Sequence, residues 1–531
     1  MERGKLGYWE IFSIGVGGMI GGGIFATLGL SLELARGAAP LAFFFAGLIA
    51  LLTSYSYAKL SARYPSVGGT IEFLVRAYGD NIVTGGLNIM LLAGYIVMIA
   101  LYAHAFGAYG ASMIPGHYSE AYTILVVFAI GSLTLVNFLG AVVSGRIELA
   151  LVAFKLFVLL FVAAVGLRLV DWSMLSPATW PPLVNIIAGG MIIFLAYEGF
   201  ELIANTAGDA ENTTVLRKAL YSAVITVISV YVLISLVSAG ALSPETVERA
   251  RDYALAILVK PVLGEAGTTL VVAAALASTS SAINATLYGT ARMSYLVAKY
   301  GEAPQILARR IWRGAYEGLV IISVLSLLLA LGTSLEAIST AGSGGFLIIF
   351  AAVNLAAYRL RRTTGANPVL ALGGAMLSLV ALSILVWRMY QLDPRQLTVL
   401  AGILAGSILV EAVYRGVTRR RLPRVVDPRL AERESMLRNW EEIAGRVASS
   451  IKKVVRDAEV FIIGSHARLE PQKAGDIDIL VVTPRKLTRE EEDAVKSAVE
   501  RDLGLPPHHP VHLHVVSKEE AGRYRHRKRI E

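Results

Sequence analysis

The sequence predicts an all-α protein that crosses a membrane many times and ends in a small soluble α/β domain. Of its 531 residues, 55% are hydrophobic and 17% are charged, whereas about 25% are charged in ordinary soluble domains. The 114 residues from Thr418 onward hold 24 Lys and Arg, 19 Asp and Glu, and six of the eight histidines. This shift in composition predicts a membrane domain over residues 1–416, a basic linker over 417–428 and a soluble domain over 429–531.

Twelve segments are long and apolar enough to cross a membrane, which takes about 20 residues of helix. Their predicted bounds are 9–32, 38–60, 82–113, 121–142, 147–170, 183–207, 217–241, 266–298, 317–333, 336–358, 367–388 and 396–416. The connections on the side of the N-terminus carry twenty Lys and Arg, and those on the other side carry seven. Because cytoplasmic loops are enriched in these residues, we expect a multi-pass protein of the cell membrane with both termini in the cytoplasm.

The first of these segments is a poor helix. It has six glycines within residues 15–23, and each interior glycine costs roughly 0.5–1 kcal/mol relative to alanine. The pairs Gly17/Gly21 and Gly18/Gly22 have the spacing of closely packed helices, which is one explanation. The interpretation that we favour is a helix broken in mid-membrane, with its free N–H groups turned to a polar ligand.

The sixth segment supports a broken helix, because it places Glu198 and Glu201 on either side of Gly199 within an apolar span. Carboxylates inside a membrane are costly and usually face a cavity. The offset of five helices between the two irregular segments suits two halves of inverted topology. The N-terminus of a half-helix attracts a carboxylate, and its C-terminal carbonyls accept hydrogen bonds from an ammonium. Such a site suits an amino acid.

Four stretches carry a family resemblance: YWEIFSIGVGGMIGGGIF, YPSVGGTIEFLVRAYGD, FLAYEGFE and ARMSYLVAKYGEAP. In this order they resemble the amino acid–polyamine–organocation (APC) superfamily, over about residues 5–416. The resemblance implies the LeuT-type fold of two inverted five-helix repeats plus two further helices. The substrate-binding positions that it implies are Gly21, Gly22, Gly23, Ala196, Tyr197 and Gly199.

Lys155 is the one cation within the apolar run of residues 148–166. A lysine at the centre of a membrane helix costs about 2.5–3.5 kcal/mol on insertion scales. It lies nine residues after Arg146, which is about 14 Å along a helix and near the middle of the membrane. Its side chain is therefore too short to reach the membrane surface, and we expect a partner or a function inside the protein.

The fifth-helix lysine is similar to that of the prokaryotic, proton-coupled, broad-specificity branch of the superfamily. This resemblance implies that the ammonium replaces the sodium ion of related transporters, beside the Gly17 carbonyl and a hydroxyl, for which Ser281 is favoured over Ser278. Loss of its proton would loosen these contacts and couple protons to alternating access. The alternative is a lysine that stays charged and only braces the fold.

Glu201 resembles a sixth-helix glutamate that is common in the family. It is the second candidate for proton coupling, or else a fixed hydrogen-bonding strut. We expect an amino-acid substrate, the proton as coupling ion and no other cofactor for transport. Exchange of amino acids or polyamines without net proton flux is the alternative.

The soluble domain begins with an amphipathic helix over 429–456, which is followed by EVFIIGSHARLEPQKAGDIDILVV. The Gly464-Ser465 turn after the first strand is suited to bind phosphates through backbone N–H groups. Asp476 and Asp478 stand two residues apart on the next strand, so they share one face and form a candidate site for a divalent metal.

This pattern resembles the minimal nucleotidyltransferases of the DNA polymerase β superfamily, over about residues 435–518. The third carboxylate of that family is not found. The later strand offers His512 and His514 instead, with His514 as the candidate third ligand. The resemblance implies binding of a nucleotide or a metal with slow or absent transfer; a membrane-anchored nucleotidyltransferase and a degenerate domain are the alternatives. No nucleic acid is expected as a partner; the terminal RYRHRKR is expected to lie in solvent or against anionic lipid headgroups, and contact with RNA is a minor alternative.

Overall fold

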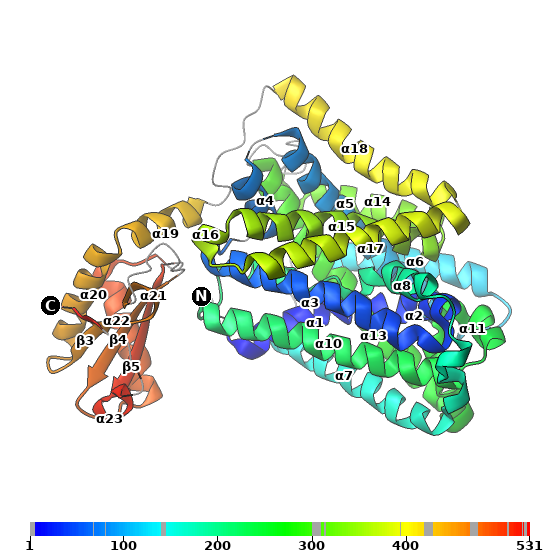
Figure 1. Cartoon of the computed structure of the whole chain (residues 1–531), viewed down its shortest axis with the longest axis horizontal. Helices are drawn as coiled ribbons and strands as arrows, with labels where there is room; N and C mark the ends of the chain where they lie inside the picture. Colours follow the sequence, from blue (N-terminus) through cyan, green and yellow to red (C-terminus); the bar gives the residue numbers. More distant parts are fainter. Residues whose placement is uncertain are drawn as a thin grey trace.

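The computed structural model consists of a large helical bundle with a small α/β domain at one end (Figure 1). The structure describes residues 6–66, 68–79, 81–139, 145–299, 310–312, 315–392, 394–418, 428–467, 476–506, 509–522, 524 and 528–530. We call the α/β domain, residues 428–530, the tail, and the end of the bundle beside it the tail-side end.

The helices of the bundle follow the predicted segments closely. The first six segments correspond to α1 (Tyr8–Met19) with α2 (Gly23–Ala35), α3 (Ala39–Arg63), α5 (Ile82–Ala111), α6 (Tyr118–Phe138), α7 (Gly145–Gly166), and α8 (Leu183–Ile192) with η5 (Phe194–Tyr197) and α9 (Leu202–Asn205). The next six correspond to α10 (Thr213–Ala241), α13 (Lys260–Lys299), α14 (Glu317–Gly332), α15 (Leu335–Arg359), α17 (Pro368–Leu392) and α18 (Pro394–Thr418).

Short elements connect these helices. They are η1 (Arg36–Ala38), α4 (Thr70–Tyr78), η2 (Leu167–Leu169), η3 (Trp172–Leu175), η4 (Pro177–Thr179), α11 (Pro244–Ala250), η6 (Arg251–Tyr253), α12 (Ala254–Leu258), β1 (Arg310–Trp312), β2 (Ala315–Tyr316) and α16 (Arg361–Thr364). Side-chain caps fix several helix starts: Asn81 accepts from the Thr84 N–H at 2.9 Å and begins α5.

Nine helices in the described part of the chain are long and apolar enough to cross a membrane, and ten if α8 and η5–α9, bent by 51°, form one broken span. One of the nine is the run Gly23–Arg63, which holds both α2 and α3, and α14 is shorter than the rest. The chain is therefore a multi-pass helical membrane protein. The count of twelve spans and the five-plus-five repeat stay predictions.

Both irregular segments are broken where the sequence predicts. The first helix stops at Met19 and restarts at Gly23, and the sixth gives way after Ile192 to the turn of η5. The two breaks touch: a Cβ on Gly199 would lie 2.4 Å from the carbonyl carbon of Gly18. Gly199 also has a φ of +125°, which only glycine adopts easily. The broken helix and close packing, set out above as alternatives, thus occur together.

The tail is a four-stranded sheet covered by helices. Its elements are α19 (Pro428–Arg438), α20 (Trp440–Val454), β3 (Glu459–Ile462), α21 (Gly464–Ala467), β4 (Ile477–Thr483), α22 (Arg489–Leu503), β5 (Val511–Ser517), α23 (Lys518–Ala521) and β6 (Lys528–Arg529). The strand order is β5-β4-β3-β6, in which β4 and β5 are parallel and the other pairs antiparallel. The single helix expected over 429–456 is wrong, since Asn439 separates α19 from α20.

A hydrophobic core joins α20 to the sheet. Val447 and Ile451 of α20 pack with Ile462, Ile477 and Ile479 of the two central strands. All five side chains are almost fully buried. Asp478 lies on β4 beside these core residues, and Asp476, expected on the same strand, directly precedes it.

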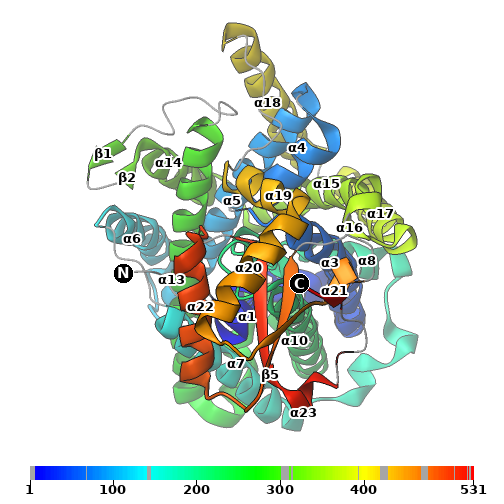
Figure 2. The same cartoon turned by 90° about the vertical axis from the view of Figure 1, so that its left-hand side faces the viewer.

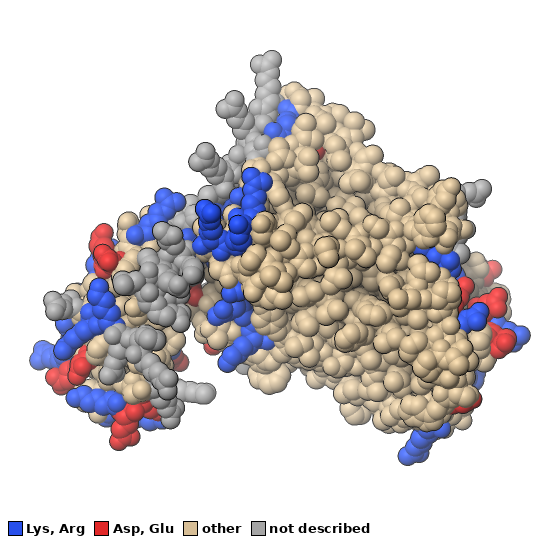
Figure 3. Space-filling model, in the orientation of Figure 1, with Lys and Arg blue, Asp and Glu red and all other residues tan. Residues whose placement is uncertain are grey.

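The tail sits against the end of the bundle where α3 ends and α10 begins (Figures 1 and 2). Lys and Arg side chains gather at this tail-side end, whereas the broad middle of the visible face of the bundle carries none (Figure 3). An uncharged belt of this kind is what the hydrocarbon of a bilayer requires.

Candidate functional site

Hydroxyl groups from other helices satisfy the backbone that the two breaks set free. Tyr231 of α10 donates to the Met19 carbonyl at 2.7 Å and to the Ala196 carbonyl at 3.1 Å, so one side chain joins both breaks. Ser278 of α13 donates to the Gly21 carbonyl at 2.5 Å. A buried carbonyl without a partner costs about 1–3 kcal/mol. These bonds therefore stabilise both breaks in the interior of the bundle.

The predicted substrate-binding residues of the two breaks lie together. A Cβ on Gly23 would lie 2.6 Å from the Cα of Ala196, and one on Gly22 would lie 2.5 Å from Cδ1 of Tyr102. Gly21 is packed against Ala282 in the same way. The helix α2 starts at Gly23 after Gly22, which offers no side-chain cap, so the first N–H groups of α2 receive no capping bond from that residue.

Tyr197 is the predicted binding residue whose side chain is directed elsewhere. Its hydroxyl donates to the Phe43 carbonyl of α3 at 2.8 Å, and its ring packs on Tyr231 with 5.1 Å between centroids. In this structure the Tyr197 side chain therefore braces the second break against α3 and α10.

Lys155 is buried, with 1% of its surface exposed, and its Nζ has no hydrogen-bond partner among the described residues. The contacts expected for it are occupied by another group. Ser281 donates to Glu148 Oε2 at 3.1 Å, and a Cβ on Gly17 would lie 2.3 Å from Glu148 Oε1. The expectation that Ser281 and the Gly17 carbonyl hold the ammonium is not met in this structure, because the Glu148 carboxylate lies between them.

Glu148 is a site residue that the sequence analysis missed. It lies seven residues before Lys155 on α7, two turns away on the same side of the helix. It is also the carboxylate whose charge reaches Lys155. It was not predicted because it lies near the end of an apolar segment, where charged residues are common. The spacing of seven to a mid-membrane lysine is the signal that could have found it.

Glu198 and Glu201 are both fully buried beside the second break. Glu201 Oε2 accepts from the Gly199 N–H at 2.7 Å and so holds the strained turn. Both oxygens of Glu198 lack a hydrogen-bond partner in the described structure. The strut interpretation therefore suits the observed contact of Glu201, whereas Glu198 is the carboxylate without a contact.

The second candidate site lies in the tail, where Asp476 is enclosed by Arg433, His512 and Thr213. Its Oδ1 accepts from Nη2 of Arg433 and lies 3.6 Å from Nε2 of His512. Its Oδ2 accepts from the hydroxyl of Thr213, in the bundle, at 2.7 Å. Burial would raise the pKa of Asp476, but His512, Arg433 and Thr213 together hold it below its ordinary value. The carboxylate is therefore charged, and each of its oxygens accepts a hydrogen bond.

Asp478 lies next to the Gly464 turn, which is predicted to bind phosphates. Gly464 has a φ of +70°, and a Cβ on it would lie 2.6 Å from Asp478 Oδ2. Asp478 Oδ1 is 3.2 Å from Nε2 of His514. The Ser465 side chain lies outside the described residues.

The predicted metal ligands Asp476, Asp478 and His514 do not form a metal site in this arrangement. In the described part of the chain, no group of three or more His, Cys, Asp and Glu is placed to hold a metal ion. The physical reason is that Arg433 takes the place of a cation at Asp476. The donor set around the two aspartates therefore does not fit a divalent metal as it stands.

Comparison with known proteins gives two family matches. A family model described as amino acid permease matches residues 6–405, and one described as nucleotidyltransferase domain matches residues 442–531. An uncharacterised protein of Methanocaldococcus jannaschii is 35% identical over 79% of this chain and 97% of its own. The inner membrane transport protein YbaT of Escherichia coli is 32% identical over 77% of this chain and 96% of its own.

Two more distant similarities concern substrates and fold. L-asparagine permease 1 of Mycobacterium tuberculosis is 25% identical over 67% of this chain and 77% of its own. The crystal structure of a manganese transporter of Eremococcus coleocola superposes with a TM-score of 0.52 at 14% identity, covering 78% of this chain and 95% of that one. The structural likeness shows that the bundle has a transporter fold.

Proposed function

The chain belongs to the amino acid permease family, and on this premise we propose that it is a secondary active transporter that moves amino acids across the cell membrane by alternating access. The contact between the two breaks carries this proposal. The uncapped N-terminus of α2 at Gly23 meets the second break at Ala196, in the middle of the bundle. N–H groups at a helix N-terminus suit the carboxylate of an amino acid.

We propose that transport is coupled to protons through Lys155. The support is an ammonium buried between helices, without a hydrogen-bond partner in the described structure and within reach of the Glu148 charge. Water that enters from one side as the helices move would let this group exchange its proton there. Amino-acid or polyamine exchange without net proton flux is the alternative.

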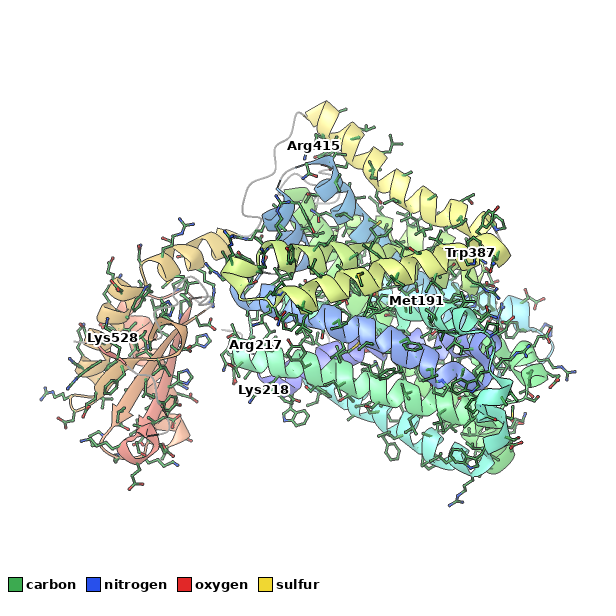
Figure 4. The ribbon with its side chains drawn as sticks, in the orientation of Figure 1. Met191, Arg217, Lys218, Trp387, Arg415 and Lys528 are labelled. Carbon is green, nitrogen blue, oxygen red and sulfur yellow. The ribbon has the colours of Figure 1, made fainter. Side chains whose placement is uncertain are left out.

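We propose that the tail-side end faces the cytoplasm. Arg217, Lys218 and Arg415 lie at this end, and Trp387 lies at the opposite end (Figure 4). Cytoplasmic loops are enriched in Lys and Arg, and tryptophan is common where a span meets the membrane surface. Both termini would then be cytoplasmic, with the tail beside the inner ends of the helices.

The test of transport is uptake by the purified full-length protein in liposomes, screened over labelled amino acids with and without an inward proton gradient. We expect accumulation of at least one amino acid only when the gradient is present. Uptake only into liposomes preloaded with amino acid would favour exchange. Neither uptake nor exchange of any amino acid would contradict the proposal.

We propose that the tail is a regulatory domain that binds a nucleotide. The family match over residues 442–531 and the Gly464 turn beside Asp478 support binding. The pairing of Asp476 with Arg433 argues against rapid metal-dependent transfer, because Arg433 must leave before Asp476 can bind a divalent cation. The full-length protein, incubated with labelled ATP and Mg²⁺ or Mn²⁺, should yield little or no nucleotidylated product. Rapid labelling that Asp476→Asn abolishes would make the tail an enzyme.

A further inference from the structure

The tail contacts the bundle through its own candidate nucleotide site. Thr213, the first residue of α10, donates to Asp476 across the domain boundary. The start of α10 is fixed by Asn212, whose side chain accepts from the Val215 N–H at 2.8 Å. Asp476 is only 8% exposed in the docked arrangement. Asp476 therefore lies buried at the boundary between the two domains.

Two arginines, one from each domain, lie near enough at this boundary for their charges to interact. Arg63 is the last residue of α3, and its charge acts on Arg433 and on His466 of the tail. The Nε and Nη1 atoms of Arg63 are buried and have no hydrogen-bond partner among the described residues. Asp476 is the carboxylate that Arg433 contacts. Buried N–H donors of a guanidinium without an acceptor call for an anion.

His466 adds a second, independent sign of a ligand. It follows the Gly464 turn in α21 and is 1% exposed, yet both of its ring nitrogens lack a hydrogen-bond partner in the described structure. Its ring packs on Trp440, with 4.7 Å between centroids. Burial lowers the pKa of His466, so the neutral ring offers one donor and one acceptor. Buried polar groups in proteins are nearly always satisfied.

We propose that Arg63, Arg433 and His466 bind the phosphate groups of a nucleotide at the boundary of the two domains, so that the nucleotide bridges the bundle and the tail without a divalent metal. This inference rests on the proposed regulatory role of the tail and specifies its site. The backbone turn at Gly464 is adjacent, and guanidinium groups bind phosphates in a forked geometry that a lysine lacks. Arg433 already neutralises Asp476, so no divalent ion is needed at that carboxylate, and the guanidinium of Arg63 supplies the positive charge for the phosphates.

A bound nucleotide would slow transport, because only the docked arrangement contains both arginines. A ligand that binds one state better shifts the population toward that state. The docked tail holds Thr213, and the segment just before it is joined to the start of α1. The Leu6 N–H donates to the Asp209 carbonyl at 2.7 Å, and the Glu211 N–H donates to the Leu6 carbonyl at 3.0 Å. Docking thus restrains the tail-side ends of α1 and α10 together.

The experiment is calorimetric titration of ATP into the full-length protein in nanodiscs of neutral lipid, with EDTA present. We expect saturable binding that Arg63→Gln weakens by at least about tenfold. Arg63→Lys keeps the charge and should weaken it less. Arg362→Gln is the matched control, since Arg362 is exposed on α16 at the same end and loses the same charge. Equal affinity in Arg63→Gln and wild type, or binding that requires Mg²⁺, would overturn the proposal.

Uptake assays separate this inference from the proposed transport function. With ATP on the tail side of the membrane, amino-acid uptake should slow in wild type and in Arg362→Gln but not in Arg63→Gln. Uptake that ATP does not affect in any of the three proteins would contradict the bridge while leaving transport intact. ATP binding with the expected Arg63 dependence, but without transport of any amino acid, would contradict the transport function and leave the binding site standing.

Discussion

The bundle and the tail both bury ionisable side chains, but these side chains differ in whether they have hydrogen-bond partners. In the bundle, Lys155 Nζ and both oxygens of Glu198 have no hydrogen-bond partner among the described residues. In the tail, Arg433 and Thr213 together engage both oxygens of Asp476. A buried charge without a partner is costly, and proteins retain it mainly where it binds or titrates. The contrast indicates that the unpartnered groups of the bundle bind or titrate, whereas the Asp476 carboxylate of the tail is held by its contacts.

The largest expected effect is that of Lys155→Ala in liposomes. Because the substitution removes the ammonium but leaves both breaks intact, we expect proton-driven accumulation to fall to background while substrate binding remains measurable. Lys218→Ala, at an exposed position at the start of α10, is the control and should transport normally. A Lys155→Ala protein that still concentrates substrate with the wild-type pH dependence would show that the lysine has no coupling role.

The next largest effect tests the contact between Asp476 and Arg433 in the tail. Asp476→Asn leaves Arg433 as a buried, uncompensated charge, which typically costs about 3–5 kcal/mol. Asp478→Asn is the matched control, because Asp478 and its partner His514 are 32% and 38% exposed, and such pairs are worth at most about 1 kcal/mol. The loss of stability in each variant is measured by hydrogen exchange of the β4 amides in the full-length protein. Equal exchange in the two variants would mean that the Arg433 contact does not stabilise the tail.

A smaller effect concerns the two glutamates of the second break. If Glu201 titrates during transport, Glu201→Gln should shift the pH profile of uptake, since an amide oxygen can still accept from the Gly199 N–H but cannot titrate. Glu198→Gln is the comparison, because Glu198 lacks the contact that Glu201 makes. A larger shift in Glu198→Gln would place the titrating group there, and an unchanged profile in Glu201→Gln would assign Glu201 to structure.

The smallest effect lies on the exposed surface of the tail. Arg485 and the Thr488 N–H lower the pKa of Glu491 from 4.5 to about 2, as part of the capping box that begins α22. A lowered carboxyl pKa stabilises the fold at neutral pH, and that contribution is lost as the pH falls from about 4.5 toward about 2. Glu491→Gln should speed amide exchange in the first turn of α22 by less than about tenfold at pH 7. The difference should shrink below pH 4; a constant difference would rule out the ionised carboxylate as its cause.

The sequence alone determined the features that depend on local chain properties. The helices appear where apolar runs predict them, because a membrane helix satisfies its own backbone and needs no partner to form. The two breaks follow from Gly21–Gly23 and Gly199, and the strand, turn and carboxylates of the tail follow from spacing. The split of the helix at Asn439 escaped prediction, since no proline or glycine marks it.

Only the tertiary structure decided which charged groups meet. Glu148 rather than Lys155 contacts Ser281, which is 133 residues away, because the packing of α7 against α1 and α13 sets which side chain reaches the gap. Thr213 and Asp476 are 263 residues apart and belong to different domains, so only docking of the tail brings them together. Residue types and their spacing select candidates for such contacts. The partners are chosen by the packing of elements that are distant in the chain, and no local pattern encodes that packing.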